Sequence, residues 1–300
     1  MRASKQTETS YPPGEMSFAR RTISFLAIIL TTFVLAPAAS AQQGASPVPF
    51  FWDTRETLPK PDLTSLARLR FLTTTDFRPF NFLDSQGRLT GFHVDLARAI
   101  CNELGIIDKC EIQALPWAEL EPALMKGDGD AIMAGIAVTA RTRENLGFTR
   151  SYLRFPARFV APLSSALEEP LAAAIQDKRV GVVSETAHES LLREQFGARN
   201  VEAFDEQDAM LDALADGRLD AAFGDGLRLA NWLGGKQGAD CCKFVGGPYI
   251  APDYLGQGLA IATRPDDTTL RAALDWALQQ VAVKGTFAEL YLRYFPIGFF

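Results

Sequence analysis

Residues 122–135 read PALMKGDGDAIMAG, and residues 212–225 read DALADGRLDAAFGD. Each stretch contains the end of a helix, a glycine that stops it, and an aspartate–alanine pair that opens a short apolar strand. Asp130 has the same place in the first stretch as Asp220 has in the second. A helix–turn–strand unit that occurs twice predicts two similar α/β lobes. Ligands of open α/β sheets bind beyond the carboxyl ends of the strands, so we expect a cleft between the lobes with Asp225 at its wall.

The segments around this repeat predict a βαβαβ order in each half of the chain, followed by one more strand and two helices. Strands are predicted at 69–75, 111–114, 131–138, 157–162, 179–183, 201–204, 219–223 and 256–262, and helices at 94–104, 116–125, 186–196, 207–215, 227–233 and 269–283, before a final helix that carries Phe287 and Tyr291. The strand at 157–162 is predicted to leave the first lobe, and the glycine-rich residues 234–238 are predicted to be a flexible turn.

These segments predict five regions. They are a signal peptide at 1–41, an extended arm at 42–66, the first part of lobe 1 at 67–162, lobe 2 at 163–255, and the second part of lobe 1 at 256–300. Because the chain crosses between the lobes twice, a hinge of two crossings is expected.

The N-terminus has the pattern of a secretory signal. Arg20 and Arg21 precede an apolar run from Ile23 to Leu35, and small residues follow up to Ala41. The apolar run is shorter than the roughly 20 residues that cross a bilayer. We therefore expect export to the periplasm with cleavage near Ala41, rather than a membrane anchor.

The composition excludes several classes of function. The net charge is −6 and no run of Lys or Arg occurs, which argues against a nucleic-acid surface. The chain has only two histidines, so a metal site is not expected. No nucleophile triad or phosphate loop is visible, and we expect no catalytic residues and no cofactor.

The four cysteines suit an exported protein. Cys101 and Cys110 flank a helix end, and we expect a disulfide between them. Cys241 and Cys242 are adjacent. For these two the sequence leaves open a strained vicinal disulfide, free thiols, or pairing elsewhere.

One segment resembles a known signature. Residues 91–100 read GFHVDLARAI, which is similar to the Gly-Phe-Asp-Val-Asp-Leu helix start of the bacterial extracellular solute-binding proteins of family 3, the periplasmic binding proteins of polar-amino-acid ABC transporters. The resemblance runs from Arg68 to Phe295 and includes FRPF at 77–80, GDGDAI at 127–132, KRVGV at 178–182, GRLDA at 217–221 and KGTF at 284–287. It implies the type II periplasmic-binding-protein fold. It also implies a monomeric, non-enzymatic protein that closes on an amino acid or a similar small polar solute and presents it to a membrane ABC permease.

The resemblance also assigns roles to residues. Asp225 matches the aspartate that binds the ligand ammonium, although a helix cap is an alternative and both roles are compatible. Phe77 and Trp117 match two aromatic residues that sandwich the ligand side chain, with ordinary core packing as the alternative. The main-chain amides near Gly135 and Ala137 would meet the main-chain end of the ligand.

The carboxylate-binding end departs from the family pattern. Thr142 stands where the family has an arginine, and Arg141 and Arg143 lie beside it. A one-residue shift would let Arg143 bind the carboxylate, and the choice between Arg143 and Arg141 stays open. The alternative is that both are solvated surface arginines. Thr186 and nearby amides would hold an anion at a helix start. Thr74 stands where binders of basic amino acids have an aspartate, which argues against lysine or arginine as ligand. His93 replaces an acid of the signature and is expected to be a capping or surface residue.

Two other functions remain as alternatives. Some proteins of this fold, such as cyclohexadienyl dehydratases, catalyse eliminations, and Glu185 and His188 would be the acid–base candidates here. Other relatives accompany quinoprotein alcohol dehydrogenases, and the altered carboxylate site leaves that role open.

Overall fold

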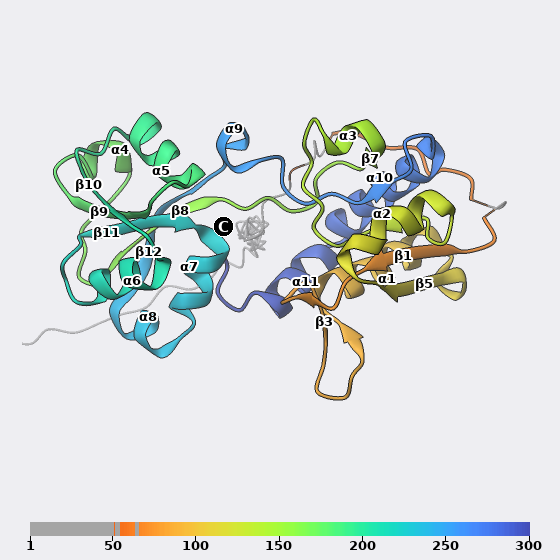
Figure 1. Cartoon of the computed structure of the whole chain (residues 1–300), viewed down its shortest axis with the longest axis horizontal. Coiled ribbons are helices and arrows are strands. Elements are labelled where there is room, and N and C mark those ends of the chain that lie inside the picture. The colour runs from red at the N-terminus through yellow and green to blue at the C-terminus, as the bar shows by residue number, and fades with distance from the viewer. Residues whose placement is uncertain (1–50, 52–54, 64–65) are drawn as a thin grey trace, which may run out of the picture. The chain divides into compact units, whose positions relative to one another are not determined.

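The computed structural model of the protein describes residues 51, 55–63 and 66–300, which belong to one compact unit, 45–300. The predicted signal peptide and most of the predicted arm lie outside the described residues. Two five-stranded sheets with flanking helices define two lobes (Figure 1).

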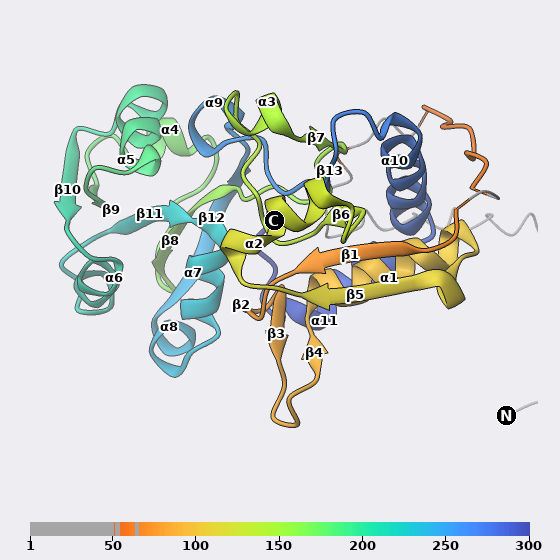
Figure 2. The same ribbon diagram turned by 45° about the vertical axis from the view of Figure 1, so that its right-hand side comes forward.

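The first sheet has the strand order β5-β1-β6-β13-β7. Strands β5, β1 and β6 are parallel, and β13 and β7 join antiparallel (Figure 2). The bounds are β1 Leu69–Thr73, β5 Cys110–Ala114, β6 Ala131–Ile132, β7 Gly147–Phe148 and β13 Ala262–Thr263. Strands β1 and β6 are almost fully buried, which explains why their sequences are mainly apolar, with Arg70 as the charged exception.

The second sheet has the order β10-β9-β11-β8-β12, and again three parallel strands are followed by two antiparallel ones. The bounds are β8 Ala157–Pro162, β9 Arg179–Val183, β10 Asn200–Phe204, β11 Ala221–Asp225 and β12 Cys242–Tyr249. The parallel strands of each sheet have the same arrangement, in which the earliest of the three in the chain lies between the other two. The duplicated sequence therefore reflects a duplicated topology.

The strand at 157–162 belongs to the second sheet, which corrects its predicted place in lobe 1. It pairs antiparallel with β11 on one side and with β12 on the other. The first crossing therefore precedes Ala157. The second crossing follows α9 (Pro252–Leu255), and the two crossing segments meet where Leu153 pairs with Leu259. The Tyr152 amide also donates to the Leu259 carbonyl at 2.9 Å.

The helices cover both sheets. Their bounds are α1 Phe92–Leu104, α2 Trp117–Lys126, α3 Thr142–Asn145, α4 Leu171–Ala174, α5 Ala187–Leu191, α6 Gln207–Ala215, α7 Gly226–Leu233, α8 Lys236–Cys241, α10 Thr268–Val283 and α11 Thr286–Tyr294. A 3-10 turn follows α1 at Ile107–Lys109, and a π-helical turn extends α5 over Leu192–Phe196. No helix in the described part of the chain is both long and apolar enough to cross a membrane.

Several predicted elements differ from the structure. The predicted strand 131–138 is only two residues long, because the chain turns into a loop beyond Ile132. The predicted flexible turn at 234–238 instead contains the start of α8. A small antiparallel sheet, for which no strands were predicted, is formed by β2 (Asp76–Phe77), β3 (Asn81–Leu83) and β4 (Leu89–Thr90). Its β3–β4 hairpin projects away from the rest of the first lobe (Figures 1 and 2).

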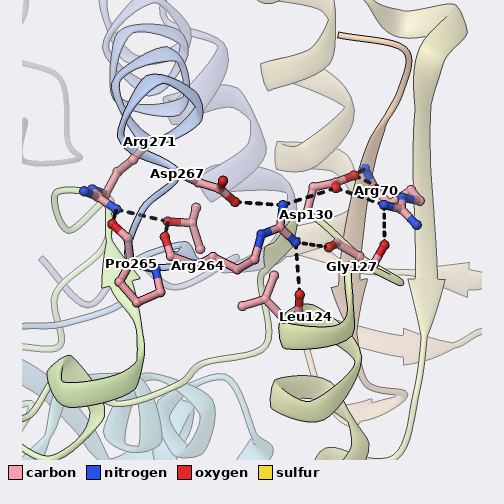
Figure 3. Close-up of polar contacts among 10 residues, drawn as sticks. Arg70, Leu124, Gly127, Asp130, Arg264, Pro265, Asp267 and Arg271 are labelled. Atoms are coloured by element: carbon pink, nitrogen blue, oxygen red, sulfur yellow. Dashed lines mark hydrogen bonds and ion pairs between the residues drawn. The ribbon is translucent and has the colours of Figure 1, made fainter.

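Asp130 explains the Gly-x-x-Asp part of the repeat. Its carboxylate accepts hydrogen bonds from the main-chain amide of Arg70 at 2.9 Å and from the guanidinium of the same residue at 3.0 and 3.1 Å. Arg264 approaches Asp130 from the other side, at 3.7 Å, and donates to the carbonyls of Leu124 and Gly129 (Figure 3). The aspartate thus ties the beginnings of β6 and β1 together.

Asp220 makes the same arrangement in the second lobe. Its carboxylate accepts from the Arg179 amide at 2.8 Å and from the Arg179 guanidinium at 2.9 and 3.3 Å. The guanidinium groups also reach matching glycine carbonyls, Gly127 in the first lobe and Gly217 in the second. Both aspartates lie at the amino ends of their strands, away from the carboxyl ends where ligands bind.

The structure joins the cysteines in two pairs. Cys101 and Cys110 are bonded across the end of α1, with their Cα atoms 6.2 Å apart. Cys241 and Cys242 are bonded to each other at the junction of α8 and β12.

Candidate ligand-binding site

A pocket of about 280 Å³ lies at the carboxyl ends of β1 and β6 in the first lobe. Its lining residues are Thr74, Asp76, Phe77, Trp117, Ala134 and Gly135. The structure therefore brings together three of the residues assigned by the resemblance. They come from separate segments, because β1, β5 and β6 are parallel and their following loops meet at one edge of the sheet.

Phe77 and Gly135 are in direct contact in this pocket. Gly135 has φ of +85°, and a Cβ atom there would lie 2.7 Å from Cε1 of Phe77. Only glycine fits this position, since it tolerates the backbone conformation and leaves room for the ring. Phe77 stacks on the buried Phe80 with 4.7 Å between ring centroids, so one face of its ring is held by the core.

Trp117 is the first residue of α2, and 56% of its side chain is exposed. A large exposed indole is unusual for ordinary core packing. Trp117 also lines a second depression, of about 550 Å³, with Met125, Ile136 and Thr142 among its neighbours.

Thr74 is one end of a chain of buried hydrogen bonds. The Asn81 amide group donates to the Thr74 carbonyl at 3.1 Å and to its hydroxyl at 2.8 Å. Nδ1 of His93 lies 2.8 Å from Oδ1 of Asn81, and Nε2 lies 2.8 Å from the Tyr152 hydroxyl. All four residues are buried.

The prediction that His93 is a capping or surface residue was wrong. The side chain is 1% exposed and points into the core beneath the pocket, where Asn81 and Tyr152 satisfy both ring nitrogens. Burial lowers the pKa of His93 to about 3, so the ring is neutral near neutral pH.

Asp225 ends β11 at the carboxyl edge of the second sheet. Its Oδ1 atom accepts from the Arg228 amide at 2.8 Å and caps α7. The other carboxylate oxygen, Oδ2, has no hydrogen-bond partner among the described residues. Asp225 therefore does cap α7, as the alternative role predicted, and its second carboxylate oxygen is left for another partner.

His188 belongs to α5 and interacts electrostatically with Asp225 at the end of β11. Burial lowers the pKa of His188, while the negative charge of Asp225 raises it and the positive charge of Arg228 lowers it. The His188 ring lies edge-on to the buried Phe223, with 6.4 Å between centroids. His188, Asp225 and Arg228 thus interact electrostatically at this edge.

Thr186 begins α5. Its hydroxyl accepts from the Glu189 amide at 3.2 Å and donates to the Val183 carbonyl at 2.8 Å, so it caps the helix. Glu185, the preceding residue, has φ of +57°, a left-handed conformation that is rare outside glycine. Such strain occurs at turns and at functional sites.

The segment expected to bind a carboxylate is arranged by Thr142. Its hydroxyl donates to the Ala137 carbonyl at 2.7 Å and accepts from the Thr139 amide at 2.9 Å, which folds the loop on itself. Arg143 lies beside Phe148, with its guanidinium 5.7 Å from the centroid of that ring. The structure does not bring Arg143 or Ala137 into the lining of the pocket that holds Phe77.

Sequence reasoning missed Asn81, Tyr152 and Asp76. Asn81 and Tyr152 form the buried chain under Thr74, and Asp76 lines the pocket itself. The position of Asp76 beside Phe77 was a usable signal. No sequence signal indicated that His93 pairs with Tyr152, which lies 59 positions away in the chain.

The two sheets, their shared strand order and the double crossing define the fold of type II periplasmic binding proteins. The chain belongs to the bacterial extracellular solute-binding proteins of family 3, whose family model matches residues 69–297. It is 31% identical over 232 residues to the histidine-binding periplasmic protein of Salmonella typhimurium, covering 76% of this chain and 87% of that protein.

Solved structures agree on the fold. An ancestral cationic amino acid solute-binding protein has a TM-score of 0.54 and 26% identity, with 76% of this chain and 96% of that chain covered. An ancestral cyclohexadienyl dehydratase has a TM-score of 0.65 and 22% identity, with 77% and 93% covered. The second likeness concerns the fold alone.

Proposed function

We propose that this protein is a periplasmic solute-binding protein that captures a free amino acid between its lobes and delivers it to an ABC transporter permease. The similarity to a histidine-binding relative, which extends over three quarters of this chain, supports an amino acid as the ligand class. The signal-like N-terminus supports a periplasmic location.

The observation that carries the proposal is the chemistry at the two carboxyl edges. One edge offers an aromatic pocket of about 280 Å³, with Phe77 on its wall and the exposed Trp117 at its rim. The other edge offers Asp225, a carboxylate with one oxygen unpaired among described residues. An amino acid needs an anion for its ammonium group and a surface for its side chain, and these two edges supply both.

The ligand carboxylate requires a cation or main-chain amides. Gly135 lies in the pocket lining, Ala137 follows two residues later in the chain, and Arg143 has no carboxylate partner among the described residues. We assign Arg143 as the carboxylate clamp, because a guanidinium binds a carboxylate through two parallel hydrogen bonds. Thr186 and the first amides of α5 would assist from the second lobe.

Thermal unfolding of the purified protein with a panel of L-amino acids tests the proposal. A ligand present at about 100 times its dissociation constant adds about 2.7 kcal/mol to the free energy of unfolding, which raises the midpoint by several degrees. Prephenate and arogenate belong in the same panel. Turnover of either compound, or silence across all amino acids from a folded, ligand-free preparation, would contradict the proposal.

A further inference from the structure

The buried chain from Tyr152 to Thr74 joins a crossing segment of the hinge to the ligand pocket. Tyr152 lies between β7 and β8, where the first crossing pairs with the second. Thr74 follows β1 and lines the pocket. Asn81 and His93 lie between them, and every donor–acceptor distance along the side chains is 2.8 Å.

The direction of this chain is set by Asn81. Its side-chain nitrogen is 3.1 Å from the main-chain carbonyl of Thr74, which can only accept a hydrogen bond. An oxygen in that place would repel the carbonyl, so the amide nitrogen must face Thr74. The Asn81 oxygen therefore faces His93.

This orientation determines the tautomer of His93. Because the Asn81 oxygen can only accept, Nδ1 of His93 carries the proton that it receives. A neutral imidazole has one proton, so Nε2 is unprotonated and accepts from the Tyr152 hydroxyl. Burial raises the pKa of Tyr152, which keeps this hydroxyl protonated as a donor.

The other end of the chain is Thr74. Its hydroxyl oxygen accepts from Asn81, so the hydroxyl proton points elsewhere. Among the described residues the Thr74 hydroxyl donates no hydrogen bond, and Thr74 is 3% exposed, at the pocket wall. A buried donor without a partner is costly, and a ligand acceptor would remove that cost.

We infer that Tyr152, His93 and Asn81 are positioning residues that orient Thr74 as a hydrogen-bond donor into the pocket, which therefore selects a ligand whose side chain carries an acceptor over one that carries only donors. This inference deepens the proposed function and rests on it for the identity of the ligand as an amino acid. A side chain with a carbonyl oxygen or an unprotonated imidazole nitrogen fits, whereas a guanidinium or ammonium offers only protons.

Nuclear magnetic resonance of the histidine rings tests the direction of the chain without any ligand. In the untagged protein with ¹⁵N-labelled histidine, His93 is expected to be the Nδ1-protonated tautomer from about pH 8 to about pH 5, since its lowered pKa keeps the ring neutral there. Tyr152→Phe is expected to shift the Nε2 resonance of His93 and to leave the tautomer unchanged. An Nε2-protonated or cationic His93 would overturn the inference.

Binding of a matched pair of amino acids tests the selection. L-citrulline and L-arginine have nearly the same shape, but citrulline carries a carbonyl oxygen where arginine carries a third nitrogen. Calorimetry is expected to show tighter binding of citrulline. Thr74→Val should weaken citrulline about tenfold and leave arginine within about twofold, because one neutral hydrogen bond is lost.

Thr74→Ser, which keeps the hydroxyl, should restore the preference for citrulline and separates the donor from any loss of folding. Equal binding of the two amino acids, or equal losses in Thr74→Val, would overturn the selection. Binding of neither amino acid, nor of any other in the panel above, would overturn the proposed function and the selection with it. The tautomer of His93 would still decide the direction of the chain.

Discussion

The two copies of the repeated unit share one end and differ at the other. At the amino ends of β6 and β11, Asp130 and Asp220 bind an arginine of the neighbouring strand through the same atoms. At the carboxyl ends the first copy finishes in Gly135, with Phe77 packed against it, and the second copy finishes in Asp225. The shared end ties neighbouring strands together, and the end that differs carries the residues that we propose to bind the ligand.

The aspartate–arginine pair at the shared end is more buried in the first lobe than in the second. The Arg70 and Asp130 side chains are 16% and 13% exposed, whereas Arg179 and Asp220 are 51% and 36% exposed. Arg264 lies beside the first pair, because the returning chain passes there on its way from β13 to α10 (Figure 3). We therefore expect the loss of this contact to lower the free energy of unfolding more in the first lobe than in the second.

The largest expected effect separates the two ends of the second copy. Asp225→Asn keeps an oxygen to cap α7 but removes the charge that would meet the ligand ammonium, and it should weaken amino-acid binding about a thousandfold. Asp220→Asn, at the other end of the same strand, should leave affinity within about twofold, because it lies away from the ligand edge. Calorimetry with the ligand found by the thermal panel checks both. Retained affinity in Asp225→Asn would place the ammonium site elsewhere.

The next effect concerns the two histidines, one in each lobe. The folded-state pKa of His93, about 3, is below its ordinary value of 6.5, so the native state disfavours the charged ring. The associated stability is fully present above the ordinary pKa and is lost as the pH falls toward the folded pKa, with about 3 kcal/mol lost by about pH 4. His93→Gln should reduce the pH dependence of the free energy of unfolding over that range, as measured by urea denaturation at a series of pH values.

His188→Gln is the matched control for this effect. The pKa of His188 is also lowered by burial, but the charge of Asp225 opposes that shift. Substitution of His188 should therefore change the slope of the unfolding free energy against pH much less than His93→Gln does. Equal slopes in both variants would argue against a neutral, fully bonded His93.

The third effect compares the two aspartate–arginine pairs. Asp130→Ala should lower the free energy of unfolding by about 2–3 kcal/mol, because it leaves a largely buried guanidinium without its carboxylate. Asp220→Ala should cost about 1 kcal/mol or less, since its pair is exposed to water. Urea unfolding of the two variants measures the difference. Equal losses would show that burial does not set the value of this contact.

The smallest effect tests the close contact at Gly135. Gly135→Ala should cost about 2 kcal/mol, part from the left-handed backbone and part from the overlap with Phe77. Gly217→Ala is the control, because Gly217 has φ of +74° and a Cβ atom added there would meet no other atom within 4 Å. It should cost about 1 kcal/mol, and urea unfolding measures both variants. If both lost the same amount, the overlap with Phe77 would be relieved by movement of the ring.

Much of the framework was predictable from local pattern. The glycine stops at Gly127 and Gly217, the apolar strands after them and the helix at 207–215 follow from periodicity and turn chemistry, and the structure has them at or near the predicted residues. The type II fold and its family were also correctly predicted. The errors were made where pairing decides the structure, as at 157–162, whose place in the second sheet depends on β11 and β12.

The sequence alone determined the repeat, the two-lobed fold and the residue types available for binding, because helix stops, buried strands and their spacing are local properties of the chain. Only the tertiary structure decided that Phe77, Trp117 and Gly135 line one pocket, and that Thr142 folds the loop where the family has an arginine. It alone buried His93 between Asn81 and Tyr152. These contacts join residues far apart in the chain, and their existence depends on which strand edges and loops meet in space.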